Sequence, residues 1–411
     1  MKTYKKIFNI LLLLYVITYP ILSTYGLYSS DIILYSLILL QIFGFLFIFE
    51  ERKSIYTIIK GLTKDKLFLT LILLNLLMYL STIVSLDMRV TITNSIRFTM
   101  YIFVFYSISY KVKDKFEKII FNSFIFVSIL SGLYTVVQLS YTKYLGYKID
   151  KTIRMPSFLE NPNNLGAYSI LIFFIVVMLL ISTKKIKYKL FYGVCSLLLL
   201  INIMFSQSRN ALIALIIGIF IIAILYDKRF LILSFIFPII FFIIPAIRAR
   251  IFQIFDMSQN SSRFNIWDVA ISIIRDNPIC GVGYENFSIQ YPRYISTNPN
   301  LIVSDGYLPL HPHNVFLKMQ AELGIIGTII FIGFVIVTII TLYKLIKYTS
   351  DTIHRSVMIG ILASYLTFLF MNLLDCYFNT PKVITTMFII LAFANHYKLN
   401  SISSKKIYKV L

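Results

Sequence analysis

The residues best suited to chemistry stand in "HPHNVFLKMQAELG", residues 311–324, where two of the four histidines precede a long apolar run. His313 could accept a proton from a hydroxyl group or orient one, because imidazole titrates near neutral pH. A helix from residue 313 onward would put His313 and Gln320 on one face, pointing into the same cavity. A capping or structural role for His313 is the alternative that the local pattern leaves open.

A zinc site is a competing interpretation, since His-x-His spacing with nearby carboxylates can bind this metal. The set is short, because Pro312 separates the histidines and no third His or Cys stands close by. Lys318 and Glu322 are instead spaced as an ion pair over one helical turn. Gly324 then allows a kink or a close approach to another helix. We therefore expect neither a metal nor a cofactor.

Arginines at the ends of apolar runs form a second set of candidates. Arg209 follows Ser208 at the start of a run that is otherwise apolar, and Arg263 starts a predicted loop helix. An ionisable group so close to hydrocarbon usually has a partner or a task. A guanidinium donates two parallel hydrogen bonds to phosphate, so a lipid pyrophosphate would suit these sites. Arg248 and Arg250 fit equally well as arginines that only reach toward the membrane surface.

Asparagines crowd the start of another apolar run, in "ENPNNLGAYS", residues 160–169. Asn161 can cap this helix, with Pro162 in its first turn. Capping needs fewer asparagines than the sequence supplies, so contact with a hydroxyl-rich ligand is an equal alternative. The candidates for additional substrate contacts are Asn314, Gln320, Asn161, Asn163, Ser208, Arg154 and Arg275.

The elements that must position these residues are membrane-spanning helices. Hydrophobic residues make up 58% of the 411 residues, charged residues make up 14%, and the mean hydropathy is +0.81, which excludes a soluble domain. The apolar runs are about 17 to 23 residues long and lack the alternation of barrel strands. We predict an all-α polytopic membrane protein with residues 1–411 in a single membrane domain. About twelve transmembrane helices are expected, at residues 7–24, 31–49, 67–85, 93–110, 118–140, 163–182, 188–205, 209–226, 230–246, 324–346, 356–374 and 383–397.

Charge predicts the orientation of these spans, since Lys and Arg concentrate in short loops on the cytoplasmic side. Most of the 39 Lys and Arg residues lie at the two chain ends and in the even-numbered connections between spans. Both termini should therefore be cytoplasmic. The net charge of +21 reflects this topology and attraction to anionic lipid, and we expect no nucleic-acid partner.

The predicted outer side carries one large loop, at about residues 247–312, and a loop of that length should contain structure of its own. Ser262 is a suitable N-cap for a helix over residues 263–276, which Asn277 and Pro278 would end. Its apolar side should lie in or near the membrane interface. That side comprises Phe264, Trp267, Ala270, Ile271 and Ile274.

Four segments between residues 160 and 331 occur in an order that resembles the O-antigen ligase and polymerase superfamily of bacterial polysaccharide assembly. They are "NPNNLGAY", "SQSRNALIALIIG", "SSRFNIWDVAISIIRDNPICGVGYENF" and "HPHNVFLKMQAELGIIG". Residues 160–331 would form the ligase-like core region, which includes the outer loop. The resemblance implies a multi-pass glycosyltransferase in the bacterial cytoplasmic (inner) membrane, with its active site at the extracytoplasmic face.

The resemblance also implies roles for single residues. Arg209 and Arg263 would bind the pyrophosphate of a polyprenyl (undecaprenyl) pyrophosphate-linked oligosaccharide, and His313 would be the catalytic histidine that engages the acceptor hydroxyl. Fixed guanidinium groups could then neutralise the leaving group without a metal, and direct displacement would invert the anomeric centre. Residues with structural or less clear roles are Glu322, Gly324 and Trp267.

Several functions remain open within this class. We expect polymerisation of surface polysaccharide repeat units, as in capsule, O-antigen or exopolysaccharide, with an acceptor glycan and the lipid bilayer as partners. A chain-length regulator and a flippase of the same pathway are further candidate partners. The first alternative is ligase-type transfer of a finished glycan to a lipid A core, a teichoic-type polymer or a protein. The second is a lipid-linked oligosaccharide flippase or transporter, which would place ionisable groups near the middle of the membrane.

Overall fold

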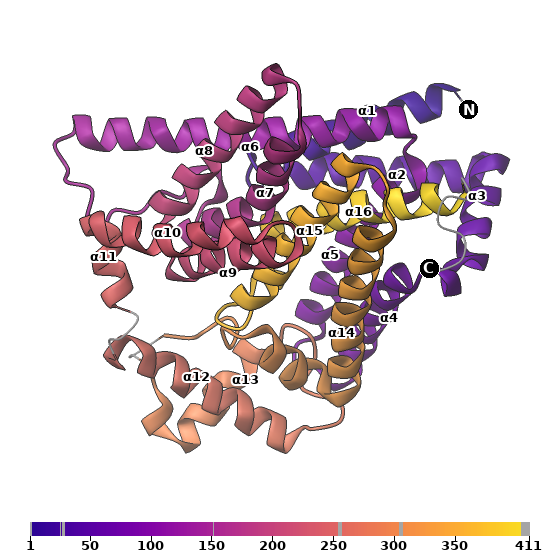
Figure 1. The fold of residues 1–411 in the computed structure, drawn as a ribbon. Helices are drawn as coiled ribbons and strands as arrows, with labels where there is room; N and C mark the ends of the chain where they lie inside the picture. Colours follow the sequence, from indigo (N-terminus) through magenta and orange to yellow (C-terminus); the bar gives the residue numbers. More distant parts are fainter. Residues whose placement is uncertain are drawn as a thin grey trace.

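The computed structural model describes residues 2–24, 26, 29–150, 152–253, 257–303 and 307–403, whose regular structure is helical throughout (Figure 1). The predicted all-α fold is thereby confirmed for this part of the chain. The longer helices are α1 (Lys2–Thr18), α2 (Ser30–Phe47), α3 (Phe49–Lys60), α4 (Lys66–Leu80), α5 (Met88–Tyr106), α6 (Asp114–Tyr144), α7 (Pro162–Ser182), α8 (Ile186–Ser206), α9 (Arg209–Leu225), α10 (Leu231–Ile243), α11 (Pro245–Phe252), α12 (Met257–Asp276), α13 (Phe287–Thr297), α14 (Val315–Tyr348), α15 (Thr352–Met371) and α16 (Pro381–Ser403).

Seven stretches among the described residues are long and apolar enough to cross a membrane, namely α2, α4 with the turn after it, α6, α7, α8, α14 and α15. An eighth is added if α10, with the short turn before it, and α11 count as one broken span, bent by 101°. The bend falls at Ile244–Pro245, because the residue before a proline avoids helical backbone angles. Every predicted span overlaps a helix, but the predicted number of about twelve is not confirmed.

The centre of the bundle is α7, which packs against α8 and α15. Nearly all its residues from Leu165 onward are buried, as expected for a helix that is apolar on every side. Close contact with α15 depends on Gly360, where a Cβ atom would lie 2.7 Å from the Cα atom of Ile175. The bundle therefore provides a rigid frame for the connections at its ends.

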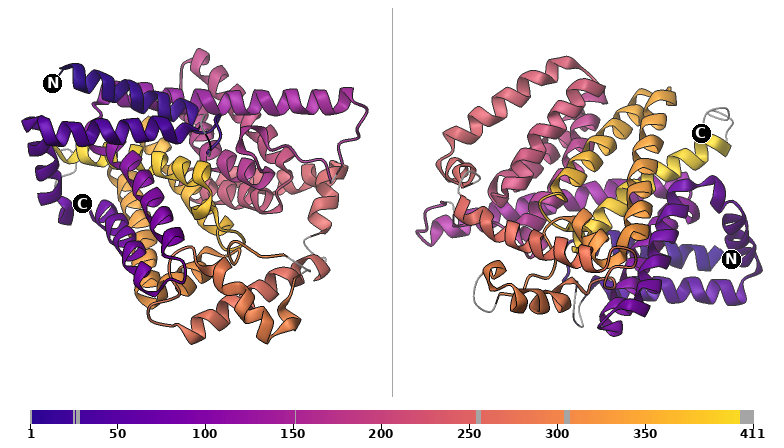
Figure 2. Two further views of the ribbon diagram at one scale, coloured as in Figure 1. Left: turned by 180° about the vertical axis from the view of Figure 1, so that it is seen from behind. Right: turned by 90° about the horizontal axis from the view of Figure 1, so that it is seen from below.

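The predicted outer loop is partly helical, as expected, and forms a layer across one end of the bundle. Figure 1 and both views of Figure 2 show α12 and α13, in salmon and orange, lying across the ends of other helices. This layer has a small core of its own. The core residues are Ile266, Val269, Ala270, Ile273, Val282, Phe287, Tyr291 and Ala321.

One prediction about the loop helix needs correction. The helix α12 begins at Met257, so Ser262 lies inside it and does not cap it, although Asp276 ends it as predicted. Its buried side is centred on Ile273, whereas Phe264 and Ile271 on the predicted apolar side are exposed, and their position in the membrane interface stays a prediction. The small core of the layer, which the helix period alone could not locate, decides which face is covered.

A break in α14 joins this layer to the bundle. Gly324 has φ 66° and ψ −167°, so the helix kinks at the glycine where the sequence allowed a kink. The segment after α12 fills the break: Val282 N–H donates to Ala321 O at 3.0 Å, and Ile325 N–H donates to Pro278 O at 3.0 Å. A Cβ atom at Gly324 would lie 2.0 Å from Ile279 O, so only glycine fits.

The same layer is fastened to the turn between α4 and α5. Tyr284 N–H donates to Ser81 Oγ at 3.0 Å, and Asp87 N–H donates to Asn286 Oδ1 at 2.9 Å. The charge pattern predicts that the outer layer and the α4–α5 connection lie on the same side of the membrane, and the two are thus in contact. The basic tail at residues 404–411, which helped to predict a cytoplasmic C-terminus, lies outside the described residues.

Candidate functional site

Four arginines converge on a cavity of about 420 Å³ at this end of the bundle. We call it the arginine cavity, after Arg154, Arg209, Arg250 and Arg263. They come from the α6–α7 connection, the first residue of α9, the short helix α11 and the loop helix α12. The other lining residues are Asn163, Ser208, Asn210, Ile213, Phe264, Trp267, Leu374, Asp375 and Tyr377. Arg209 and Arg263, the two predicted pyrophosphate ligands, therefore share one cavity.

The tight turn between α8 and α9 positions Arg209 and Arg154. Gln207, in the left-handed conformation with φ 48°, ends α8, and Arg209 begins α9 two residues later. The buried Gln207 amide donates to Asp150 O at 2.8 Å and to Ile153 O at 3.1 Å, which fixes the loop that carries Arg154. Arg209 donates to Gln253 O at 2.7 Å. One turn thus holds two of the guanidinium groups.

Neutral oxygen atoms hold Arg154. Its Nε–H donates to Ser206 O at 2.9 Å, and its second guanidinium nitrogen donates to Asn163 Oδ1. Burial lowers the pKa of Arg154 to about 10, and the neighbouring Arg250 and Arg209 act in the same direction. Arg154 therefore keeps its charge at neutral pH.

The two asparagines singled out in the sequence have different contacts. Asn161 caps α7, because its side chain accepts from Asn163 N–H at 2.8 Å, and Pro162 follows in the first turn as predicted. Asn163 lines the arginine cavity. Both alternatives for these asparagines thus have structural support, each at its own residue.

Arg250 belongs to the site although the sequence gave it no preference over a surface arginine. It donates to Gln207 O at 3.3 Å and to Gln253 Oε1 at 2.8 Å. Within the described part of the chain, Arg154, Arg250 and Arg263 form no ion pair with a carboxylate. The cavity therefore gathers four guanidinium groups around one lining carboxylate, that of Asp375.

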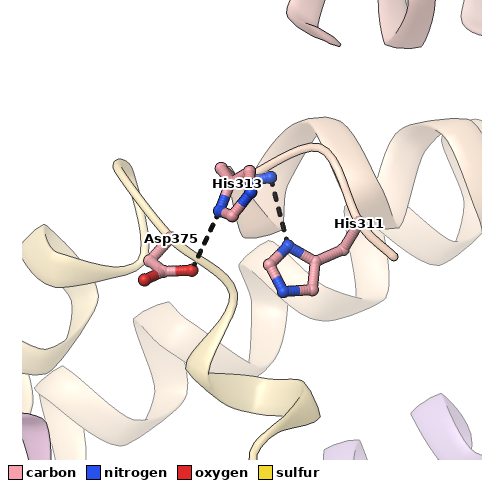
Figure 3. Close-up of side chains that lie close together, drawn as sticks. All are labelled: His311, His313 and Asp375. Carbon is pink, nitrogen blue, oxygen red and sulfur yellow. Dashed lines mark hydrogen bonds and ion pairs between the residues drawn. The ribbon is translucent and has the colours of Figure 1, made fainter. Parts of the chain in front are cut away.

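A histidine–aspartate pair, drawn in Figure 3, lies beside the arginine cavity, because Asp375 lines that cavity. His313 Nδ1 is 3.2 Å from Asp375 Oδ1, and Asp375, from the α15–α16 connection, lines the cavity. Burial acts to raise the pKa of Asp375, but the hydrogen bond and charge of His313 outweigh it and lower this pKa below its usual value. Asp375 is therefore a carboxylate at neutral pH. It can accept a hydrogen bond from Nδ1–H of His313, which leaves Nε2 available as a base.

The helix start corrects the prediction for Gln320. Asn314 is the N-cap of α14 and accepts from Phe316 N–H at 2.9 Å, so His313 lies before the helix, with φ 52°. Gln320 donates to Pro278 O at 3.1 Å and does not line the arginine cavity. His313 and Gln320 do not share the predicted face, because the face argument assumed a helix that already included residue 313.

His311 shapes the turn that presents His313. Its Nδ1 accepts from His313 N–H at 3.3 Å (Figure 3). Burial and, to a smaller extent, the nearby His313 lower the pKa of His311 to about 4, so His311 is neutral at physiological pH. A left-handed conformation is costly for a residue with a side chain, and the fixed turn retains it at His313.

The fold brings Asp375 close to the two histidines as a third potential zinc ligand. In the part of the chain that the structure describes, potential ligand atoms of His311, His313 and Asp375 lie within 4.8 Å of one another. Three ligands would suit a catalytic zinc site. The arginine cavity next to Asp375 disfavours a cation there by repulsion, since four guanidinium groups line it. The expectation that the site needs no metal stays a prediction.

A buried charge triad supports the same region and consists of Glu285, Lys318 and Glu322. Lys318 Nζ pairs with Glu285 Oε1 at 3.0 Å and with Glu322 Oε2, so the predicted Lys318–Glu322 pair is confirmed. Asn379 Nδ2 donates to Glu285 Oε2 at 2.8 Å. The triad thus joins the outer layer, the start of α14 and the connection that carries Asp375.

Asp375 and Tyr377 are among the cavity residues that sequence reasoning missed. Both lie in "LLDCYFNT", residues 373–380, a polar stretch between two apolar spans. The argument that identified Arg209, a charge placed directly at a span end, applies equally to Asp375. Arg275, by contrast, lies outside the arginine cavity and lines a smaller one at the other end of α12.

The O-antigen ligase family model matches residues 194–332, a stretch that contains Arg209, Arg263 and His313 and ends before Asp375. The match confirms the resemblance to the O-antigen ligase and polymerase superfamily. No curated protein matches the chain significantly.

Proposed function

We propose that this member of the O-antigen ligase and polymerase superfamily transfers a glycan from a polyprenyl pyrophosphate donor to an acceptor sugar hydroxyl at the extracytoplasmic face. The family match supports a membrane glycan-transfer role in polysaccharide synthesis. The single observation that carries the finer proposal is the arginine cavity beside the His313–Asp375 pair. The arginine cavity suits an anion, and the His313–Asp375 pair suits the proton of a hydroxyl group.

The arginine cavity suits the leaving group of such a reaction. When the bond between the anomeric carbon and the pyrophosphate oxygen breaks, the lipid pyrophosphate gains negative charge. Guanidinium groups that are already held by backbone carbonyls can stabilise that charge without reorganising. Arg209 and Arg154 are held in this way, at 2.7 Å and 2.9 Å from their carbonyl oxygens. The proposed reaction therefore needs no metal ion to neutralise the pyrophosphate.

The histidine pair suits the acceptor. The acceptor hydroxyl oxygen forms a bond to the anomeric carbon, and its proton passes to His313 Nε2. Asp375 orients the imidazole and stabilises the imidazolium that results. Because the acceptor attacks opposite the departing pyrophosphate, the anomeric centre inverts.

Polymerisation of repeat units, as in capsule, O-antigen or exopolysaccharide, is the reaction that we favour. The richness of the sequence in Ile, Lys, Asn, Phe and Tyr suggests an AT-rich source, such as a Gram-positive organism without a lipid A core. Ligase-type transfer of a finished glycan is the second candidate, and the description of the matching family favours it. The flippase alternative has less support, because the converging arginines lie in a connection, at the start of α9 and in the outer helices α11 and α12.

The proposed setting follows from the same reasoning. Several apolar helices and the family match support a multi-pass membrane protein. We propose the cytoplasmic membrane of a bacterium, with both chain termini cytoplasmic and the arginine cavity outside. The lipid bilayer and the lipid-linked donor would be its immediate partners, and a chain-length regulator or flippase of the pathway could act beside it.

Purified full-length protein supplied with a defined polyprenyl pyrophosphate oligosaccharide tests the function. A longer lipid-linked chain identifies a polymerase, and glycan on a different acceptor identifies a ligase. His313→Ala should lower kcat about 10²- to 10⁴-fold, the usual contribution of general acid–base catalysis. Near wild-type turnover by His313→Ala, or absence of any product with the wild-type protein, would contradict the proposal.

A further inference from the structure

A second polar cavity, of about 210 Å³, lies at the far end of α12. We call it the second cavity. It is lined by Ser272, Arg275, Asp276, Tyr294, Thr297, Asn298 and Leu301, and it shares no residue with the arginine cavity. The end of α12, the end of α13 and the turn after α13 enclose it, so the outer layer alone forms this cavity.

The chemistry of the second cavity suits a neutral, hydroxyl-rich ligand. Tyr294 OH donates to Asp276 Oδ2 at 2.8 Å and holds the tyrosine ring, which is only partly buried, in the wall. An aromatic ring can cover the apolar face of a sugar, while a carboxylate and a guanidinium bond its hydroxyls. Arg275 and Asp276 carry opposite charges and contribute no net charge. This contrasts with the arginine cavity, which suits an anion.

One helix face connects the two cavities. Phe264, Asp268, Ile271 and Arg275 follow one another at intervals of four, three and four residues, and therefore lie on one face of α12. Phe264 lines the arginine cavity and is 49% exposed, and Ile271 is 42% exposed. The opposite face is buried in the small core of the layer. At 1.5 Å per residue, the distance along the helix from Phe264 to Arg275 is about 16 Å.

We propose that the second cavity is a subsite for the glycan of the lipid-linked donor, several sugars away from its pyrophosphate. The inference rests on the proposed function, because it takes the arginine cavity as the pyrophosphate site. A glycan of several repeat units is far larger than a cavity of about 420 Å³. It must leave that cavity, and the exposed face of α12 leads to the nearest surface with sugar-binding chemistry on the same helix.

The test measures lipid binding by the full-length protein in nanodiscs. One probe is glycan-free polyprenyl pyrophosphate, and the other is the same lipid carrying several repeat units, extracted from the source strain. Tyr294→Ala and Arg275→Ala should each weaken binding of the glycan-carrying lipid about tenfold, as expected for loss of one good contact. Binding of the glycan-free lipid should not change. Arg293→Ala is the matched control, because Arg293 is exposed on α13 but does not line the second cavity.

The outcomes separate this inference from the function beneath it. Equal loss of affinity for both lipids in Tyr294→Ala, or no loss for either, would overturn the subsite. A wild-type protein that binds the glycan-carrying lipid no better than the glycan-free one would also overturn it, and would leave the pyrophosphate site intact. A wild-type protein that binds neither lipid would remove both proposals.

Discussion

The two ends of α16 illustrate two uses of charge in this protein. Its first turn comes shortly after Tyr377, which lines the arginine cavity. Near its last turn, Lys398 pairs with Asp65 Oδ1 at 2.8 Å. Asp65 also accepts from Tyr110 and from Asn395, the latter at 2.9 Å. At that end each buried charge is matched by a charge of opposite sign.

At the arginine cavity the balance is different. Arg154 and Arg250 bond to neutral oxygens, and within the described residues neither they nor Arg263 pair with a carboxylate. Folding gains little from gathering like charges, since they repel each other. Removing one partner of a buried pair such as Lys398–Asp65 destabilises the fold, whereas a cluster of guanidinium groups indicates an anionic ligand.

The largest effect is expected at the paired end and should be on stability. Lys398→Met leaves the buried Asp65 without its cation, which costs about 3–5 kcal/mol of unfolding free energy. Thermal unfolding in detergent measures it. The double variant Asp65→Asn/Lys398→Met should recover most of the loss, because no charge is left uncompensated. A Lys398→Met variant as stable as wild type would show that this pair is not structural.

The next largest effect is expected at the arginine cavity and should be on activity. Arg263→Ala should lower kcat about 10²- to 10³-fold, as loss of a transition-state donor does, with an unchanged unfolding temperature. Arg229→Ala, an exposed arginine in the α9–α10 connection, is the control and should have full activity. If Arg263→Ala were destabilised like Lys398→Met, the distinction between the two ends would fail.

Asp375→Asn should have a smaller effect, a decrease of about 10- to 100-fold in kcat with little change in donor KM. The pKa of Asp375 lies below its usual value, so the carboxylate is ionised at every pH above about 4. The defect should therefore be constant between about pH 5 and 8, measured as the ratio of the two kcat profiles. A ratio that returns to one at pH 5 would mean that the wild-type carboxylate is protonated there.

The smallest effect distinguishes the two asparagines at the start of α7. Asn161→Ala should cost about 1 kcal/mol of stability through loss of the cap and leave turnover unchanged. Asn163→Ala should instead weaken donor binding, because Arg154 loses its amide partner. Measuring unfolding and KM for both variants checks this. Reversal of the two phenotypes would show that the cap, and not the contact with Arg154, serves the ligand.

Local polarity in the sequence was enough to single out Arg209 and His313 as candidates, because a charged or titratable group next to an apolar span is visible in a short window. Arg263 stood out as an arginine at the start of a predicted loop helix. Asp375 is separated from His313 by 62 residues, and only the packing of the α15–α16 connection against the start of α14 joins them. The Gln320 prediction failed for a different reason. His313 has a left-handed conformation and precedes Asn314, the N-cap of α14. The helix therefore begins after His313, and His313 shares no helical face with Gln320.

The most direct test of the central claim compares two lipids. Wild-type protein in nanodiscs should bind polyprenyl pyrophosphate at least about tenfold more tightly than polyprenyl monophosphate, because several guanidinium groups face the additional phosphate. Arg263→Ala should lose most of this preference, while Lys398→Met, if it folds, should keep it. Equal affinity of the wild-type protein for the two lipids would contradict the assignment of the arginine cavity as a pyrophosphate site.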